Sequence, residues 1–232
     1  MRPTFLEVNL NQLKINLQNI RAHTDTKIMT MVKANAYGHG IDGVAPFIES
    51  YTDCFGVALV EEGIHLRQLG IKKPILIAGG TLIEQLPFFF EHDLILTASS
   101  LDLLTASDHL AKSSGKRLKV HLKIDTGMER VGVHEYEAEE FLIRSLACSQ
   151  NTEIEGIYTH LANSETMSLR EELRSNSTKQ SPKQLEIASP LARNDGFVDA
   201  KLQLERFQEV LSFYEKIVYQ LPCDMFVTLV ES

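Results

Sequence analysis

Lys33 has the sequence setting in this chain that most clearly favours chemistry. It follows an apolar run at 28–32 and precedes a segment of small residues that includes Gly38 and Gly40. Apolar neighbours lower the pKa of a lysine, and the free amine is a nucleophile that can form a Schiff base with an aldehyde. The two glycines let the backbone approach a ligand closely. A surface lysine at a strand end is the alternative interpretation of this position.

Strand alternation places further polar side chains on a shared face. In the apolar segment that ends at Asp125, the residues His121, Lys123 and Asp125 share one face, and the apolar residues between them lie on the other. We expect the apolar set to face helices and the polar set to face a barrel axis. His160 ends a later strand in the same way, and barrel enzymes keep their sites at such carboxyl ends. For His121 alone, a buried core histidine is the favoured interpretation.

Apolar runs alternate with helix-period segments, which is typical of βα units and a parallel sheet. Helical patterns cover 61–70 and 137–148, and the first helix carries apolar residues at helical spacing (Leu10, Leu13, Leu17 and Ile20). Candidate strands lie at 27–32, 54–59, 74–78, 93–97, 119–124, 154–160 and 226–230. The pattern predicts an α/β fold, a (β/α)8-type TIM barrel that is incomplete because only about seven strands are counted. Such an arc leaves two unpaired strand edges.

A single domain at 1–232 is expected, since α/β barrels reach this size. A polar stretch at about 166–200 is rich in Ser, Asn, Lys and Gln, and we interpret it as an inserted surface loop. The apolar face of a strong helix follows it (Phe207, Val210, Leu211, Tyr214, Ile217, Val218 and Leu221).

Composition excludes several classes of function. The net charge of −8 leaves no basic stripe for nucleic acid, and no stretch approaches the ~20 apolar residues needed to cross a membrane. The start of the chain does not have the pattern of a signal peptide. Three scattered cysteines without a CxxC pair indicate free thiols, not disulfides or a zinc site, so no metal and a cytoplasmic location are expected.

Four segments resemble the alanine racemase family, in the family's order. In chain order they are FLEVNL at 5–10, VKANAYGHG at 32–40, KIDTGMERVGV at 123–133 and EGIYTHLAN at 155–163. The resemblance implies the family's N-terminal barrel domain, which binds pyridoxal 5'-phosphate. It also implies the interconversion of L- and D-alanine, which supplies D-alanine for peptidoglycan.

The resemblance also implies roles for individual residues. Lys33 matches the lysine that carries the cofactor and serves as one base, and Tyr37 matches a contact of the cofactor phosphate. Arg130 would meet the cofactor's phenolic oxygen and the substrate carboxylate, a task suited to a planar bidentate donor. Lys123 matches a lysine that the family often carries as a carbamate. His160 resembles the histidine beneath the cofactor ring and is counted with Lys33 and Arg130 as catalytic.

The family takes its second base, a tyrosine, from a β domain of the partner subunit, so a homodimer is expected for full-length members. We expect no such domain here, and the chain alone is predicted to bind cofactor weakly and racemise alanine slowly. Ser232 could contact the phosphate, although Glu231 would bring an unfavourable charge. The alternatives are a stand-alone pyridoxal-phosphate-binding homeostasis protein without racemase activity, and an inactive racemase fragment.

Overall fold

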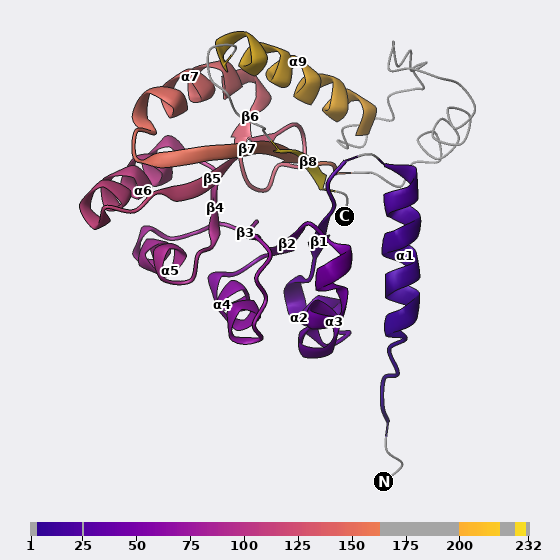
Figure 1. The fold of residues 1–232 in the computed structure, drawn as a ribbon. Coiled ribbons are helices and arrows are strands. Elements are labelled where there is room, and N and C mark those ends of the chain that lie inside the picture. Colours follow the sequence, from indigo (N-terminus) through magenta and orange to yellow (C-terminus); the bar gives the residue numbers. More distant parts are fainter. Residues whose placement is uncertain (1–3, 25, 163–199, 219–225, 231–232) are drawn as a thin grey trace.

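The computed structural model describes residues 4–24, 26–162, 200–218 and 226–230, and its main feature is a curled parallel sheet (Figure 1). Seven strands lie in the order β1-β2-β3-β4-β5-β7-β8. They are β1 (Met29–Met31), β2 (Cys54–Val57), β3 (Ile75–Ile77), β4 (Ile95–Ala98), β5 (Leu118–Asp125), β7 (Thr152–His160) and β8 (Phe226–Val230). The prediction of an incomplete α/β barrel with about seven strands is confirmed.

One short strand was not expected. β6 (Val133–His134) pairs in parallel with the end of β5, where Val133 lies opposite Ile124. Two residues carry too little periodicity to predict a strand. A second irregularity is the register shift between Val120 and His121, where β5 pairs with β7. It changes which residues of β7 lie opposite β5.

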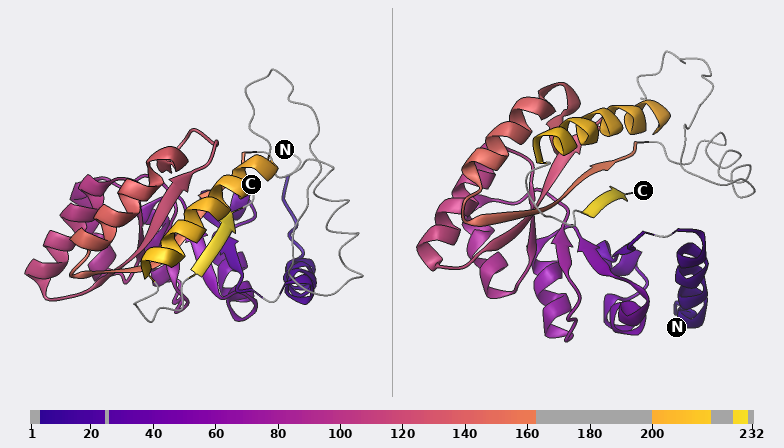
Figure 2. Two further views of the ribbon diagram at one scale, coloured as in Figure 1. Left: turned by 90° about the horizontal axis from the view of Figure 1, so that it is seen from above. Right: turned by 45° about the horizontal axis from the view of Figure 1, so that its top comes forward.

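The helices lie on the outer side of the curl, as the two views of Figure 2 show. They are α1 (Leu10–His23), α2 (Lys33–Tyr37), α3 (Ile41–Ile48), α4 (Val60–Gln68), α5 (Leu86–Glu91), α6 (Leu101–Ser114), α7 (Ala138–Cys148) and α9 (Ala200–Val218). Short 3-10 turns are η1 (Glu49–Tyr51), η2 (Ile83–Gln85) and η3 (Glu135–Glu137). Gly70 and Gly115 follow helices with positive φ angles of 87° and 65°, which glycine adopts readily.

The core has two layers. The larger layer lies between sheet and helices and includes Leu122 and Ile124, which therefore face the helices as expected. The smaller layer lies inside the curl, where Leu76, Ile95 and Tyr158 pack together. Buried parallel strands need apolar residues on both faces, which explains the continuous apolar run of β3.

The expected buried stripe of α1 is found only in part. Leu17 is buried and Leu10 and Leu13 pack against the core, but Ile20 is 51% exposed. The reason is that α1 lies at the side of the curl and packs on α3 and η1, not across a strand pair. The predicted insertion at 166–200 lies outside the described residues except for Ala200, which begins α9.

Candidate active site

Lys33 lies two residues after the end of β1 and begins an unusual turn. Ala34, Asn35, Ala36 and Tyr37 have φ angles of 52°, 58°, 53° and 54°, so α2 is a left-handed helical turn. Each non-glycine residue in this conformation costs about 1–2 kcal/mol, and such strain persists only where the surroundings impose it.

Hydrogen bonds on both sides hold this turn. Val32 N donates to Gly56 O of β2 at 2.9 Å, which ties the residue before Lys33 to the sheet. The side chain of Asn35 accepts from Ile41 N at 2.8 Å, which fixes the turn to the start of α3. The Lys33 Nζ lies 5.8 Å from the centre of the Tyr37 ring, and Tyr37 itself is 57% exposed.

Asp125 shapes the loop that carries Arg130. Its Oδ1 accepts from the backbone N–H groups of Gly127, Met128 and Glu129 at 2.9, 2.8 and 3.1 Å, and its Oδ2 accepts from Arg130 N at 3.1 Å. Burial would raise the pKa of the carboxyl group, but these hydrogen bonds outweigh it and hold the pKa below the ordinary value of 3.8. The ionised Asp125 therefore fixes the backbone from which the Arg130 side chain extends.

Lys123 is a buried amine on the inner face of β5. Its Nζ donates to Ile124 O at 3.0 Å and lies 5.3 Å from the centre of the Tyr158 ring. Burial is the main reason that the pKa of Lys123 is lowered to about 8; the charge of Asp125 opposes this shift, and the charge of Arg130 contributes to it. At pH 7 most of Lys123 is therefore still protonated, and a minor fraction, on the order of a tenth, is the neutral, nucleophilic amine.

Tyr158 and His160 project from β7 into the same region. The Tyr158 hydroxyl lies 2.9 Å from Thr97 Oγ1 and donates to Ala78 O at 3.4 Å. Burial, together with the charges of Arg130, Lys123 and Lys33, lowers the pKa of His160 to about 4, so the ring is neutral at neutral pH. Its Nε2 is buried, and none of the described residues forms a hydrogen bond with it.

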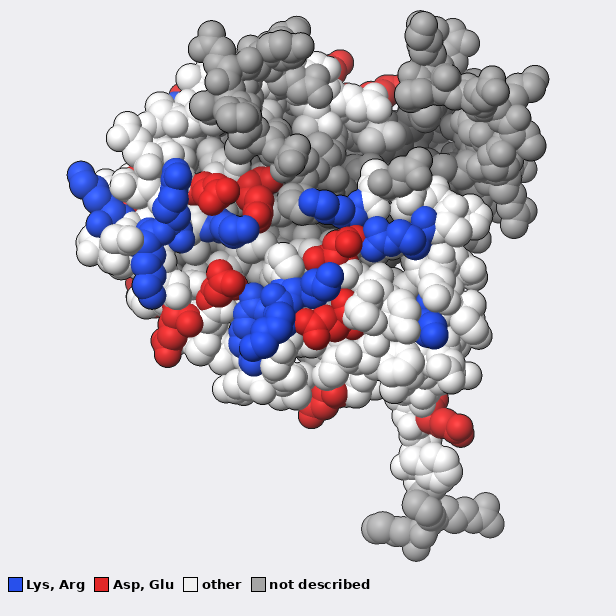
Figure 3. Space-filling view, in the orientation of Figure 1, with Lys and Arg blue, Asp and Glu red and all other residues white. Residues whose placement is uncertain are grey.

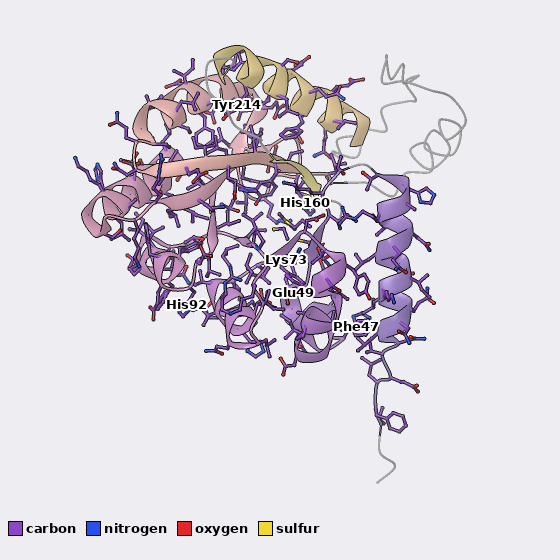
Figure 4. All side chains as sticks on the ribbon, viewed as in Figure 1. Phe47, Glu49, Lys73, His92, His160 and Tyr214 are labelled. Carbon is purple, nitrogen blue, oxygen red and sulfur yellow. The ribbon has the colours of Figure 1, made fainter. Side chains whose placement is uncertain are left out.

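The helix α9 supports this region from outside. Gln203 is fully buried; its side chain accepts from Ala162 N at 2.7 Å and donates to Thr126 Oγ1 at 3.3 Å and to His160 O at 3.4 Å. Arg206 donates to Thr126 O at 3.1 Å. The ends of β5 and β7 are thus held together. Figure 4 shows His160 inside the curl, whereas Tyr214 of α9 packs on the outer side.

These elements enclose a cavity of about 290 Å³ at the carboxyl ends of the strands. Its lining includes five of the sequence-predicted residues (Lys33, Tyr37, Lys123, Arg130 and His160) together with Met31, Ala58, Ala78, Gly79, Met128, Val131 and Tyr158. Three of these side chains are lysine or arginine, so the cavity suits an anionic ligand. Ser232, the remaining predicted contact, lies outside the described residues.

His121 lies on the inner face of the sheet, as alternation predicts, and its ring packs edge-on against Tyr158, but it does not line this cavity. Its Nε2 lies 3.6 Å from Glu155 Oε2, in a smaller cavity of about 70 Å³ near the amino ends of the strands. Alternation gives the face of a residue but not its height along the strand. The neighbouring His121 and Lys119 side chains lower the pKa of Glu155 to about 2, which is the pattern of a structural ion pair, here with an exposed lysine and a partly buried glutamate.

Residues 8–223 match the family profile described as alanine racemase, N-terminal domain. The chain belongs to this family. It is 39% identical over 168 residues to alanine racemase 2 of Caldanaerobacter subterraneus and 37% identical over 166 residues to the alanine racemase of Methanococcus maripaludis. These alignments cover 71% and 70% of this chain but only 43% and 44% of the relatives, so the chain spans less than half of their length.

Solved structures show the same relationship. The alanine racemase of Clostridium difficile 630 superposes with a TM-score of 0.75 at 28% identity, over 99% of this chain and 55% of that chain. The histidine racemase of Leuconostoc mesenteroides, at 21% identity and a TM-score of 0.67, supports the fold alone.

Two contributors to the site were missed from the sequence. Glu62 bonds to the turn after Lys33, and Gln203 joins the ends of β5 and β7. Glu62 is the third residue of α4, a position where a glutamate side chain commonly accepts hydrogen bonds from backbone N–H groups at the start of the helix. Nothing in the sequence predicts that Glu62 also binds the turn after Lys33, and nothing predicts any hydrogen-bond partner of Gln203.

Of the described residues, none belongs to a helix with the length and apolar character needed to cross a membrane.

On the face shown in Figure 3, acidic and basic side chains are interleaved.

Proposed function

We propose that this chain forms the pyridoxal-phosphate-binding part of an alanine racemase, with Lys33, Arg130 and His160 in its chemistry. The observation that carries the proposal is the convergence of Lys33, Lys123 and Arg130 on one cavity that also contains the buried, neutral His160. Each residue comes from a segment that resembles the family, and the chain belongs to that family.

The residues present fit the cofactor. The cavity offers positive charge to a phosphate ester and a phenolate, and the buried Nε2 of His160 has no hydrogen-bond partner among the described residues. An orphaned buried polar atom favours a ligand that satisfies it. When bound, pyridoxal phosphate would act as the electron sink that makes the α-hydrogen of an amino acid acidic.

The protein would contribute attachment, orientation and proton transfer. Lys33 would hold the aldehyde of the cofactor until the amino group of the substrate displaces it, and the freed Nζ would then take a proton from one face of the substrate. Arg130 would bind the substrate carboxylate through two parallel hydrogen bonds and contact the phenolic oxygen of the cofactor. His160 would lie beneath the ring, and its neutral state avoids a further positive charge there. Tyr37 would contact the phosphate.

Lys123 would act through Arg130. As an unmodified cation it repels Arg130, whose charge lowers the pKa of Lys123. Carbamylation would replace a positive charge by a negative one and turn this repulsion into attraction. The pKa of about 8 supports the modification, because only the neutral amine reacts with carbon dioxide.

The remaining parts of the proposal rest on the family. Racemisation needs a second base on the opposite face of the substrate, and we infer that a tyrosine of a partner subunit supplies it in a homodimer. Alanine as substrate follows from the names of the relatives, and the supply of D-alanine for peptidoglycan follows from the resemblance to the family. The free thiols Cys54 and Cys148 support a reducing, cytoplasmic location.

Borohydride trapping tests the proposal. The protein is mixed with pyridoxal phosphate, reduced, digested and mapped by mass spectrometry. We expect the stable label on Lys33, and we expect Lys33→Met to lose it while Lys72→Met, at an exposed position, keeps it. Labels spread over surface lysines with Lys33 unmodified would contradict the proposal. A parallel assay of D- and L-alanine interconversion separates a racemase from a protein that only binds the cofactor.

A further inference from the structure

Glu62 is a carboxylate that joins two βα units. It lies in the first turn of α4, where its Oε2 accepts from the backbone N–H groups of Ala58 and Leu59 at 2.9 and 3.0 Å. Its Oε1 accepts from Ala34 N at 2.6 Å, and this amide belongs to the residue that follows Lys33. One side chain therefore binds the entry of α4 and the start of the left-handed turn.

The Ala34 amide lies where the left-handed turn begins. Ala34 is its first residue with a positive φ, and Lys33 stands immediately before it. The residue on the other side, Val32, donates its N–H to Gly56 O of β2. The backbone of Lys33 is thus fixed on both sides by groups from the second βα unit.

We propose that Glu62 is a positioning residue for Lys33: its hydrogen bond to Ala34 N holds the left-handed turn and so aims the lysine amine into the cavity. The inference rests on the proposed role of Lys33 in attaching an anionic aldehyde. The new element is that the rate at which the aldehyde attaches to Lys33 depends on Glu62, a residue that does not itself line the cavity.

The chemistry requires a carboxylate at this position. Three N–H donors converge on the two oxygens of Glu62, and an ionised carboxylate offers acceptors only. A glutamine of the same shape replaces one oxygen by an NH₂ group. That group would face either Ala34 N–H or the two N–H groups at the entry of α4, so one side of the junction must lose its bonds.

The experiment compares Glu62→Gln with Glu61→Gln. Glu61 is exposed in the same first turn of α4, so its substitution removes an equal charge from the same helix end. In each protein, the rate of pyridoxal phosphate attachment is followed by borohydride quenching at successive times and peptide mapping. The rate at Lys33 is divided by the rate at the exposed Lys72 in the same sample. This ratio corrects for general unfolding, which would label all lysines faster.

We expect Glu62→Gln to lower the Lys33 ratio by at least about tenfold, because a hydrogen bond to a charged acceptor is lost. Glu61→Gln should stay within about twofold of the unsubstituted protein. Equal ratios in the two variants would overturn the inference and leave the proposed function intact. An unlabelled Lys33 in the unsubstituted protein would instead overturn the proposed function.

Amide hydrogen exchange in the unsubstituted protein is the second measurement, and it does not need the variant to fold. The Ala34 amide should be protected, whereas without the Glu62 bond it would exchange like the amide of an exposed loop. Rapid exchange at Ala34 would overturn the inference whatever the labelling result.

Discussion

Asp125→Asn should loosen the Arg130 loop and destabilise the protein. The carboxylate accepts four backbone hydrogen bonds, three at Oδ1 and one at Oδ2. An asparagine that keeps its oxygen at the Oδ1 position retains three weaker bonds, but its NH₂ group then faces the Arg130 N–H. One charged bond is lost outright, and three lose their charge.

The magnitude follows from the bond types. A hydrogen bond to a charged group contributes about 1.5–3 kcal/mol and a neutral one about 1, and a buried donor without a partner adds a penalty. Because such effects are not additive, we expect the free energy of unfolding to fall by about 2–5 kcal/mol. Urea denaturation measures this change, and Asp102→Asn, at an exposed position in the first turn of α6, is the matched control at about 1 kcal/mol or less.

The pH dependence provides a second criterion. The pKa of Asp125 is lowered in the folded protein, so its contribution to stability is fully present above the unfolded value of 3.8 and is lost as the pH falls through the lower folded value. The stability difference between the two proteins should therefore shrink below about pH 3.8. An unfolding free energy within about 0.5 kcal/mol of the unsubstituted protein at pH 7, with unchanged amide exchange at 127–130, would refute this reasoning.

Three further predictions concern the inner face of the sheet. In buffer free of carbon dioxide, Lys123→Met should stabilise the protein by about 1–3 kcal/mol at pH 7, because a charged amine is costly to bury. This gain in stability should fade as the pH rises from about 8 towards 10.5, where the amine of the unsubstituted protein loses its charge. In ¹³C-bicarbonate, the unsubstituted protein should show a carbamate NMR signal that the Lys123→Met variant lacks. His160 should titrate in NMR spectra near pH 4, with stability lost as the pH falls from 6.5 to that value, and a titration at the ordinary value would contradict its burial among cations. Tyr158→Phe should cost about 1–2 kcal/mol in urea denaturation through its lost bond to Thr97, whereas Tyr136→Phe, at a side chain 74% exposed, should cost nothing measurable.

Short-range patterns explain what the sequence could predict. Apolar runs located all seven main strands, and the position of Lys33 after one of them predicted a loop at the carboxyl end of the sheet, where the structure has a cavity. The inward face of Lys123 followed from alternation along a single strand. Each of these depends on residues within a few positions of one another.

The features that the sequence could not predict depend on contacts between residues far apart in the sequence, or on how far along its strand a residue lies. Ala34 and Ala36 favour ordinary right-handed helix, and only the surrounding bonds impose the opposite hand. The reach of Glu62 to a turn 28 residues earlier leaves no periodic trace. The inward direction of His121 was predictable, but its place at the far end of the sheet depends on the register between strands.

The two carboxylates that hold the cationic loops differ in the length of chain they close. Asp125 binds amides two to five residues away, so its loop closes at little entropic cost. Glu62 closes 28 residues and needs β1, β2 and α4 to be in place first. We therefore expect the arginine half of the cavity to form early in folding and the lysine half late. Pulsed hydrogen exchange during refolding should protect the Arg130 amide before that of Ala34, and the reverse order would contradict this sequence of events.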